Sequence, residues 1–386
     1  MSVRGITNVR LVRPDGVRPG CLLIKDGVFA AVHVDVCELP PGVETSDGHD
    51  RLVAPGLIDI HVHGGGGFDL MSADPEQVRA YARWVARRGV TGFLVSTSGR
   101  DHADIVAKLR ALAPVVGPVE GGARVLGFHL EGPYINPVRK GAFPPAWLRP
   151  PSASEYRELF AASGGAVRQV TLAPELPDAD ALIDAVLDSG ATAAIGHTDA
   201  TYEQAVAAID RGCAHVTHTF NAMRPFGHRD PGVLGAVLTS ERVTCELIGD
   251  GAHVDYAAAR VLLRARGPSK VALITDGMPL AGTHDGDGSW EGQAIRVDGG
   301  RAVRVSDGTI IGGVITLDQT MRNAVEHLGM QLHHAVSSAA TVAARAIGLG
   351  STYGILEAGH IADFVMLDDE LRVVEVWVNG SRVAPA

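Results

Sequence analysis

The central part of the chain alternates between short apolar runs and amphipathic stretches, and this alternation limits the fold more than any other feature. The runs that read as strands are 56–63, 91–97, 125–131, 169–174, 192–197, 215–220, 243–249 and 271–276. Helical periodicity separates most of them, for example at 76–88, 102–112, 179–187 and 202–211. Eight alternating strand–helix units favour an α/β fold whose parallel sheet closes into a (β/α)8 TIM-like barrel. An open doubly wound sheet is the structural alternative, and it would spread the strand ends along a wide edge.

Both ends of the chain read as short strands with turn signals between them. Because neither end could bury its own face alone, residues 1–53 and 359–386 are predicted to form one small β-sandwich domain. Residues 54–358 would then form the catalytic barrel. The remaining predicted segments are a Gly- and Asp-rich excursion at 278–313 and helices at 317–328 and 334–347.

Composition and charge exclude several classes of partner. The formal net charge of −10, without a run of Lys or Arg, argues against nucleic acid. No apolar run approaches the ~20 residues that span a bilayer, and the N-terminus lacks the apolar stretch of a signal peptide. The four cysteines, Cys21, Cys37, Cys213 and Cys245, form no Cys-x-x-Cys pair and are predicted to be buried free thiols. We therefore expect a cytoplasmic protein with no membrane partner.

Side chains that can hold a metal ion stand at the ends of the predicted strands. His61 and His63 end the first run, and they point the same way because strand residues alternate between faces. Later runs end at Glu131, His197, His218 and Asp276. Each residue alone could be a cap, an ion pair or part of a turn. A barrel, however, gathers the C-terminal ends of all its strands around one mouth, and imidazole with carboxylate suits zinc or iron.

Three residues near these ends have more specific expected roles. Asp276 could accept a proton from a water molecule and pass it to a leaving amine, while a bound divalent ion lowers the pKa of that water from 15.7 to about 7. His129 lies on the same strand face as Glu131 and is expected to support a ligand. His215 lies three positions before His218 and is expected to be structural.

The segment Pro55–Gly64 resembles the opening strand of the amidohydrolase superfamily. Five further motifs resemble one branch of it, the family of N-acetylglucosamine-6-phosphate deacetylases, and the likeness covers nearly the whole chain. These motifs are His129-Leu130-Glu131-Gly132-Pro133, Gly196-His197-Thr198, His218-Thr219-Phe220-Asn221-Ala222-Met223, Asp250-Gly251-Ala252-His253 and Thr275-Asp276-Gly277.

The resemblance implies a role for each candidate ligand. Glu131, His197 and His218 would hold the principal ion, and His61 and His63 would support a second one bridged by Glu131. One or two divalent ions per subunit are expected, Zn²⁺ first, with Fe²⁺, Co²⁺ or Mn²⁺ as alternatives. Asp276, itself counted among the ligands, would be the proton shuttle. The reaction would release acetate and glucosamine 6-phosphate from N-acetylglucosamine 6-phosphate, in amino-sugar catabolism or cell-wall recycling.

The same resemblance implies substrate contacts. The residues expected to bind the sugar phosphate are Asn221, Ala222, His253, Ala142, Gly313 and Arg229. Arg229 matches an arginine that reaches the phosphate in the neighbouring subunit, which implies a homodimer with shared active sites; by itself it would read as a solvated loop charge. Two positions depart from the family pattern: Phe143, where some relatives have histidine, and Gly313, where a serine is expected.

Two other functions stay open from the sequence. Another amide or cyclic-amide hydrolase of the superfamily, such as a dihydroorotase or hydantoinase, would bridge its metals with a carboxylated lysine after the fourth strand. That strand ends Leu172-Ala173-Pro174-Glu175, with no lysine. A non-catalytic barrel serving in assembly or regulation is the second alternative, and it would be expected to have lost ligands, whereas all six are present.

Overall fold

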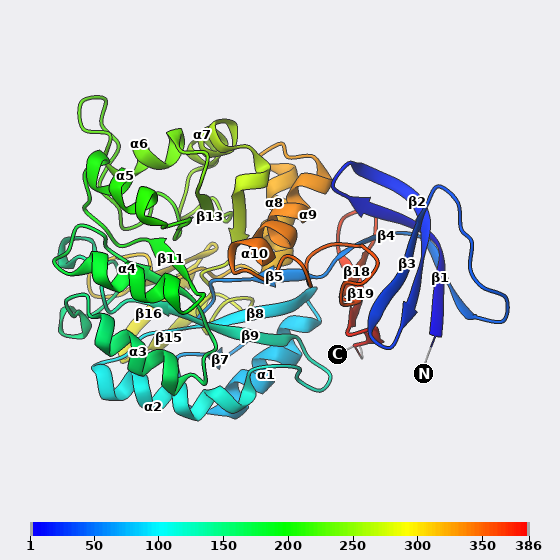
Figure 1. The fold of residues 1–386 in the computed structure, drawn as a ribbon, viewed down its shortest axis with the longest axis horizontal. Coiled ribbons are helices and arrows are strands. Elements are labelled where there is room, and N and C mark those ends of the chain that lie inside the picture. Colours follow the sequence, from blue (N-terminus) through cyan, green and yellow to red (C-terminus); the bar gives the residue numbers. More distant parts are fainter. Residues whose placement is uncertain (1–2, 384–386) are drawn as a thin grey trace.

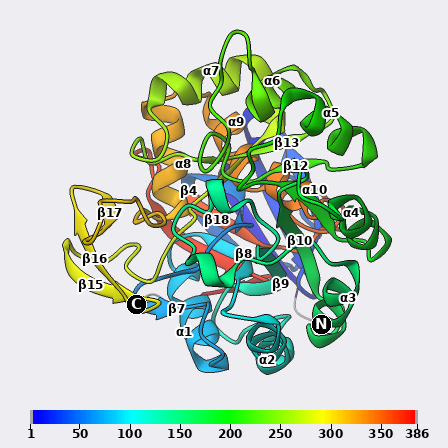
Figure 2. The same cartoon turned by 90° about the vertical axis from the view of Figure 1, so that its left-hand side faces the viewer.

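Eight parallel strands form the centre of the molecule in a computed structural model that describes residues 3–383. They are β5 (Leu57–Asp59), β8 (Val90–Thr97), β9 (Arg124–Glu131), β10 (Val167–Leu172), β11 (Thr192–Ile195), β12 (His215–Val216), β13 (Thr244–Ile248) and β14 (Val271–Ile274). Each pairs with the next in chain order, and the predicted TIM-like barrel is confirmed (Figures 1 and 2). The strands read as continuous apolar runs because both faces of a helix-covered parallel sheet are buried.

The barrel closes at its mouth rather than along the whole length of the first and last strands. Val62 pairs with Gly277 in an isolated parallel bridge just beyond β5 and β14. The Asp276 amide donates to the His61 carbonyl at 2.9 Å, and the His63 amide donates to the Gly277 carbonyl at 2.7 Å. The closure therefore lies at the residues that carry the first and last candidate ligands.

Helices surround this barrel (Figure 2). They are α1 (Pro75–Ala86), α2 (His102–Leu112), α3 (Ala153–Ala162), α4 (Ala179–Asp188), α5 (Tyr202–Arg211), α6 (Gly232–Thr239), α7 (Tyr256–Arg266) and α8 (Leu317–Glu326). The helix predicted at 334–347 is instead two helices, α9 (Leu332–Ala339) and α10 (Thr341–Ala346). Ala340 between them leaves the helical region, with φ −136° and ψ −73°. The Gly354 backbone packs against its carbonyl there, a tertiary contact that helical periodicity does not reveal.

The two ends of the chain share one seven-stranded sheet at the flank of the barrel (Figure 1). Its strands are β1 (Val3–Arg13), β2 (Gly16–Lys25), β3 (Val28–Val34), β4 (Glu44–Pro55), β18 (Phe364–Leu367), β19 (Val373–Val378) and β20 (Ser381–Arg382). Apolar side chains from both ends, such as Leu22, Phe29 and Phe364, form one core cluster. This arrangement fits the expected sandwich. The exact domain limits remain a prediction, since β4 runs past residue 53.

The prediction of four free thiols is wrong for one pair. Cys21 and Cys37 form a disulfide, because the chain after β3 turns back and brings their Cα atoms to 5.5 Å. Cys213 and Cys245 are free and buried, as predicted. Among the described residues, every helix is too short or too polar to cross a membrane.

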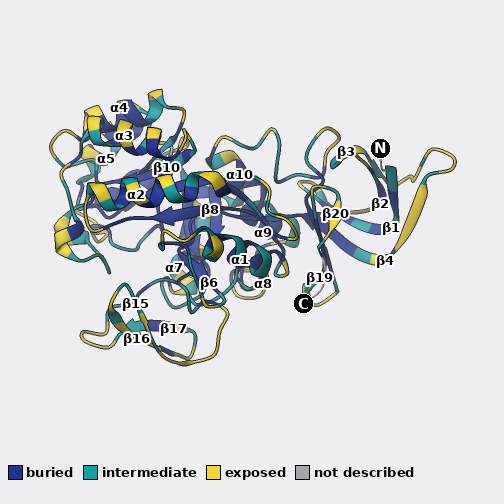
Figure 3. Ribbon diagram, turned by 90° about the horizontal axis from the view of Figure 1, so that it is seen from below, coloured by how far each residue is buried: buried dark blue, intermediate teal, exposed yellow. Residues whose placement is uncertain are grey.

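The excursion after β14 forms a small antiparallel sheet that stands off the barrel with exposed edges (Figure 3). It contains β15 (Gly286–Trp290), β16 (Gln293–Asp298) and β17 (Arg301–Arg304). A small apolar cluster of Ile295, Val297 and Ala302 with Met278 and Ile311 anchors it. The turn between β15 and β16 lines the pocket described below.

Candidate metal centre

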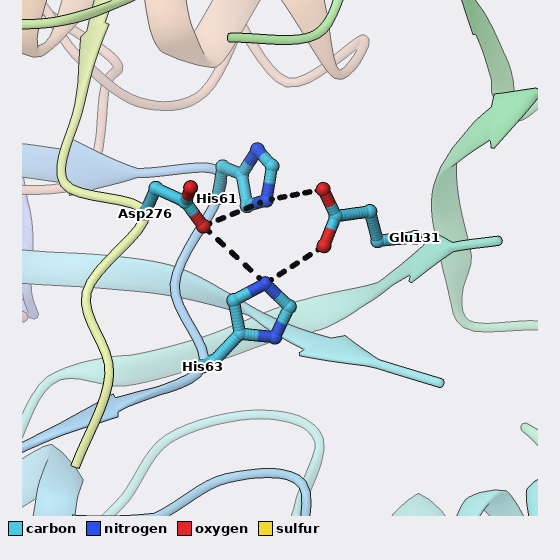
Figure 4. Close-up of side chains that lie close together, drawn as sticks. All are labelled: His61, His63, Glu131 and Asp276. Carbon is cyan, nitrogen blue, oxygen red and sulfur yellow. Dashed lines mark ion pairs between the residues drawn. The ribbon is translucent and has the colours of Figure 1, made fainter. Parts of the chain in front are cut away.

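Two overlapping groups of candidate ligands lie at the barrel mouth. The four-ligand group is His61, His63, Glu131 and Asp276 (Figure 4), and the three-ligand group is Glu131, His197 and His218; within each, the ligand atoms lie within 4.8 Å of one another. Glu131 belongs to both groups. All six residues predicted from the strand ends are therefore brought together.

The ligands reach the mouth through a repeated local geometry. His61, His197, His218 and Asp276 each stand two residues after the last residue of their strand, and Glu131 is the last residue of β9. Three of them have a positive φ: 47° at His197, 26° at His218 and 48° at Asp276. Such values are rare for residues with a side chain and concentrate at functional sites. The backbone thus leaves the barrel wall at these points and turns the side chain inward.

The three-ligand group has the donor set and spacing of a cation site. Glu131 Oε1 lies 3.1 Å from His197 Nε2 and 3.0 Å from His218 Nε2, and the two imidazole nitrogens are 3.0 Å apart. His197 Nδ1 faces the Arg139 carbonyl at 2.8 Å. Since a carbonyl only accepts, Nδ1 carries the hydrogen and Nε2 offers its lone pair to the group.

The four-ligand group also converges on a small volume. His63 Nε2 lies 3.0 Å from Glu131 Oε2 and 3.4 Å from Asp276 Oδ1. His61 Nε2 lies 3.4 Å from Glu131 Oε1 and 3.3 Å from Asp276 Oδ1. Within residues 3–383 this His61 nitrogen is buried and makes no hydrogen bond. A divalent cation would satisfy it, so the residues present fit a metal ion in both groups.

The electrostatics of the centre favour positive charge. Burial would raise the pKa of Glu131, but the charge of His61 and the close contacts with the imidazoles of His197 and His218 hold it well below its ordinary value. Burial would likewise lower the pKa of His63, yet its contacts with Asp276 and Glu131 raise it to about 9. The buried carboxylate of Glu131 and the partly exposed carboxylate of Asp276 thus draw positive charge into the site, which a bound cation can supply instead of protons.

Beneath the ligands lies a buried polar layer that the sequence interpretation partly missed. Glu246 on β13 contacts His61 and His215, and it was not predicted, although a carboxylate inside an apolar strand signals the need for a buried partner. His215 lies outside both ligand groups and bonds Glu246 at 2.9 Å. His129 bonds Ser96 and Thr171 rather than a ligand, and its ring packs against that of His61 at 4.5 Å between centroids.

A pocket opens above the two groups. Four of the predicted substrate residues line it, namely Ala142, Asn221, Ala222 and His253. Gly313 does not line it, although its neighbour Gly312 does, and Arg229 lies exposed outside it. The lining residues that were not predicted as contacts include Met71, Phe143, Trp147, Trp290, Glu291 and Gln293. Three of these lie on the β15–β16 turn, whose approach to the barrel depends on tertiary contacts.

The two departures from the family pattern have visible positions. The Phe143 ring packs edge-on against the imidazole of His197, with 5.3 Å between centroids. Gly313 lies behind Asp276, where its amide donates to the Asp276 carbonyl at 2.7 Å. A Cβ at Gly313 would lie 2.1 Å from the Thr275 carbonyl oxygen, so this backbone has no room for a serine.

Comparisons with known proteins agree with this geometry. Residues 52–383 match the model of the Amidohydrolase family. The chain is 34% identical to the N-acetylglucosamine-6-phosphate deacetylase of Bacillus subtilis, over 95% of this chain and 93% of that protein. It is 36% identical to the N-acetylgalactosamine-6-phosphate deacetylase of Escherichia coli O157:H7, over 93% of each.

A solved structure extends the likeness to the fold. A mutant N-acetyl-D-glucosamine-6-phosphate deacetylase from Mycobacterium smegmatis, in complex with N-acetyl-D-glucosamine 6-phosphate, superposes with a TM-score of 0.91 at 36% identity, covering 100% of both chains. The eight-stranded barrel, the two ligand groups at its mouth and the matched residues 52–383 lead to one conclusion. The chain belongs to the amidohydrolase family.

Proposed function

We propose that this protein hydrolyses the acetamide of N-acetylglucosamine 6-phosphate to glucosamine 6-phosphate and acetate. The observation that carries the proposal is the pair of ligand groups sharing Glu131 at the floor of one pocket. Relatives that span almost the whole chain bear the name of this activity. A divalent ion, Zn²⁺ first among the candidates, would when bound polarise the acetamide carbonyl and lower the pKa of the attacking water.

Asp276 is proposed as the residue that moves the proton. Its Oδ1 lies 3.3 Å from His61 Nε2 and 3.4 Å from His63 Nε2, at the edge of the four-ligand group. Burial would raise its pKa, but the charge of His61 and the hydrogen bond from His63 lower it, so the carboxylate is ionised and ready to accept. It takes the proton of the water whose oxygen adds to the carbonyl carbon, and it delivers that proton to the amine nitrogen as the C–N bond breaks.

The upper pocket offers donors for the sugar phosphate. His253 Nδ1 faces Asp250 Oδ2 at 2.7 Å. Burial would lower the pKa of His253, but Asp250 raises it above its ordinary value, which favours the positively charged imidazole. Its Nε2–H and the Asn221 amide are proposed to bind the phosphate or sugar hydroxyls, with Ala142 and Ala222 lining the site and Gly313 supporting Asp276 from behind.

Arg229 is proposed to act in a neighbouring subunit. It is exposed and lies outside the pocket of its own chain, so it can serve a substrate only across an interface. A guanidinium suits bidentate binding of phosphate. We therefore propose a homodimer with shared sites. A sugar phosphate is charged and does not cross a bilayer unaided, which supports the proposed cytoplasmic location.

The cyclic-amide alternative has less support. The position after β10 that would carry a bridging lysine is occupied by Ala173, Pro174 and Glu175. The Glu175 carboxylate accepts from Asn136, Thr198 and the Asp199 amide, away from both ligand groups.

The test is acetate release from N-acetylglucosamine 6-phosphate by the purified protein. Release should stop with a chelator and return with added Zn²⁺. Asp276→Asn should reduce turnover by about 10²–10⁴-fold while the ion of the three-ligand group stays bound, as metal analysis can show. The galactosamine epimer serves as the comparison substrate. The proposal would be overturned if the zinc-loaded protein released no acetate from N-acetylglucosamine 6-phosphate, whether or not it released acetate from the galactosamine epimer.

A further inference from the structure

Glu246 is a charged residue in the middle of β13, which is buried from Cys245 to Ile248 and contributes no member to either ligand group within residues 3–383. Its side chain is 0% exposed. Oε1 lies 2.7 Å from Gln169 Nε2 and 2.9 Å from His215 Nε2. Oε2 lies 2.9 Å from the backbone nitrogen of His218 and 2.8 Å from His61 Nδ1. Both oxygens are therefore fully engaged with four groups that lie on, or directly beyond, three other barrel strands, β5, β10 and β12.

These contacts determine which ring nitrogen of His61 carries the hydrogen. The backbone N–H of His218 can only donate, and the Gln169 amide donates to the other oxygen, so the carboxylate acts as acceptor throughout. The His61 nitrogen that faces it must then carry a hydrogen. A neutral imidazole with its hydrogen on Nδ1 has its lone pair on Nε2. That Nε2 is the buried, unpaired nitrogen that points at Glu131 and Asp276.

The other imidazoles are held differently. His197 has its Nδ1 fixed by the Arg139 carbonyl, independently of Glu246. The Nδ1 atoms of His63 and His218 have no hydrogen-bond partner in the described part of the chain. Glu246 touches His218 only through its backbone amide. The effect of Glu246 on imidazole chemistry therefore falls on His61, and through it on the four-ligand group alone.

We propose that Glu246 is a positioning residue that holds the lone pair of His61 toward the four-ligand group and so makes that group able to bind its ion. The three-ligand group binds its ion without this help. The inference rests on the proposed function only in taking the two groups as metal sites. Residues that orient a metal ligand from behind typically contribute 10–100-fold to metal affinity.

The test compares two substitutions of one side chain. Glu246→Met keeps the approximate volume and removes the acceptor, while Glu246→Gln retains one oxygen that can accept from His61. Zinc content is measured across a series of buffered free Zn²⁺ concentrations, together with thermal unfolding of the zinc-free proteins. The wild type should bind two ions, and Glu246→Met should weaken one of them by 10–100-fold and spare the other. Glu246→Gln should lose less than the Met variant.

Two controls separate positioning from general loosening of the barrel. Gln169→Met removes a partner of the other Glu246 oxygen and should leave both zinc affinities within about threefold of wild type, well below the 10–100-fold loss expected when a ligand loses the group that orients it. His63→Ala should abolish binding at the four-ligand group. Adding Glu246→Met to His63→Ala should then leave the affinity for the remaining ion unchanged. Should Glu246→Met fail to fold, Glu246→Asp takes its place: the shorter side chain withdraws its carboxylate from His61 Nδ1, now 2.8 Å away, and weaker binding of one ion with the other spared is again expected.

Three results would overturn the proposal: wild-type affinity for both ions in Glu246→Met, a parallel loss of both ions, or a wild type that binds a single ion. Acetate release by a one-ion wild type would leave the proposed function standing while removing this inference. Conversely, the predicted zinc pattern without acetate release would support the role of Glu246 and refute the proposed reaction.

Discussion

Gly313→Ala tests whether the backbone behind Asp276 sets the position of that carboxylate, and a control variant distinguishes this effect from a loss of overall stability. The Gly313 amide donates to the Asp276 carbonyl at 2.7 Å, and the Gly313 carbonyl accepts from Met278 at 3.1 Å. An added Cβ would lie 2.1 Å from the Thr275 oxygen, whereas ordinary contacts begin at 3.4 Å. One of the two backbones must therefore move by more than about 1 Å, and the Thr275 backbone leads directly into Asp276.

A misplacement of about 1 Å lowers the rate of a well-positioned reaction by about 10²-fold, and overpacking costs about 1–3 kcal/mol of stability. We therefore expect kcat/KM for acetate release to fall about 10²-fold, with a lower melting temperature. The control is Gly308→Ala in the same excursion, where φ is +72° and no atom lies within 4 Å of the added Cβ. Left-handed strain there should cost about 1–2 kcal/mol and leave kcat/KM unchanged. A wild-type rate in Gly313→Ala would show that the contact between the Gly313 and Thr275 backbones does not set the position of Asp276.

Three further substitutions test other parts of the molecule. Arg229→Ala should raise KM for N-acetylglucosamine 6-phosphate about 10–100-fold, the loss of one charged hydrogen bond. An equal rise with the unphosphorylated sugar would contradict a phosphate contact. Cys37→Ser opens a disulfide loop with a separation of 16 residues, and it should lower the free energy of unfolding by about 3 kcal/mol in denaturant titrations. If Cys37→Ser were still less stable than the wild type when both are unfolded in a thiol reductant, the lost disulfide would not be the cause. Burial raises the pKa of Asp363 from 3.8 to about 6, so the folded chain binds the proton more tightly and stability falls as the pH rises from about 4 to above 6. Asp363→Asn should therefore gain up to about 3 kcal/mol at pH 8 and nothing at pH 4, and equal melting-temperature gains at both values would refute the assignment.

The barrel could be predicted from sequence because strands buried on both faces form continuous apolar runs. The ends of these runs also located the candidate ligands, since His197 and His218 lie only two residues beyond the last residues of their strands. Five of the eight predicted strands, those matching β5, β11, β12, β13 and β14, were longer than the observed ones. At β11 and β12 the sequence pattern does not reveal where the strand stops before its ligand. The positive φ of His197 and His218 ends the extended backbone there.

Features that depend on register between distant strands could not be predicted. Glu246 meets His61 and Gln169 only because the barrel brings β5, β10 and β13 into one interior layer. The approach of Trp290 to the pocket depends on how a small sheet packs on the barrel, not on its own sequence pattern. The Cys21–Cys37 disulfide depends likewise on the turn after β3, and the spacing of 16 residues matches no motif.

The common offset of the ligands limits how the gene can change. Four ligands stand two residues beyond their strands, and Asp250, at the same offset after β13, orients His253 instead. A single-codon insertion between a strand and its ligand would swing that side chain out of the mouth, while insertions farther along the loop would leave it in place. Length variation among descendants should therefore accumulate beyond this second residue. The corresponding position after β8 is Gly99, where an added Cβ would lie 2.7 Å from side-chain atoms of Asp104 and Ile105, so this strand end has no room for a ligand.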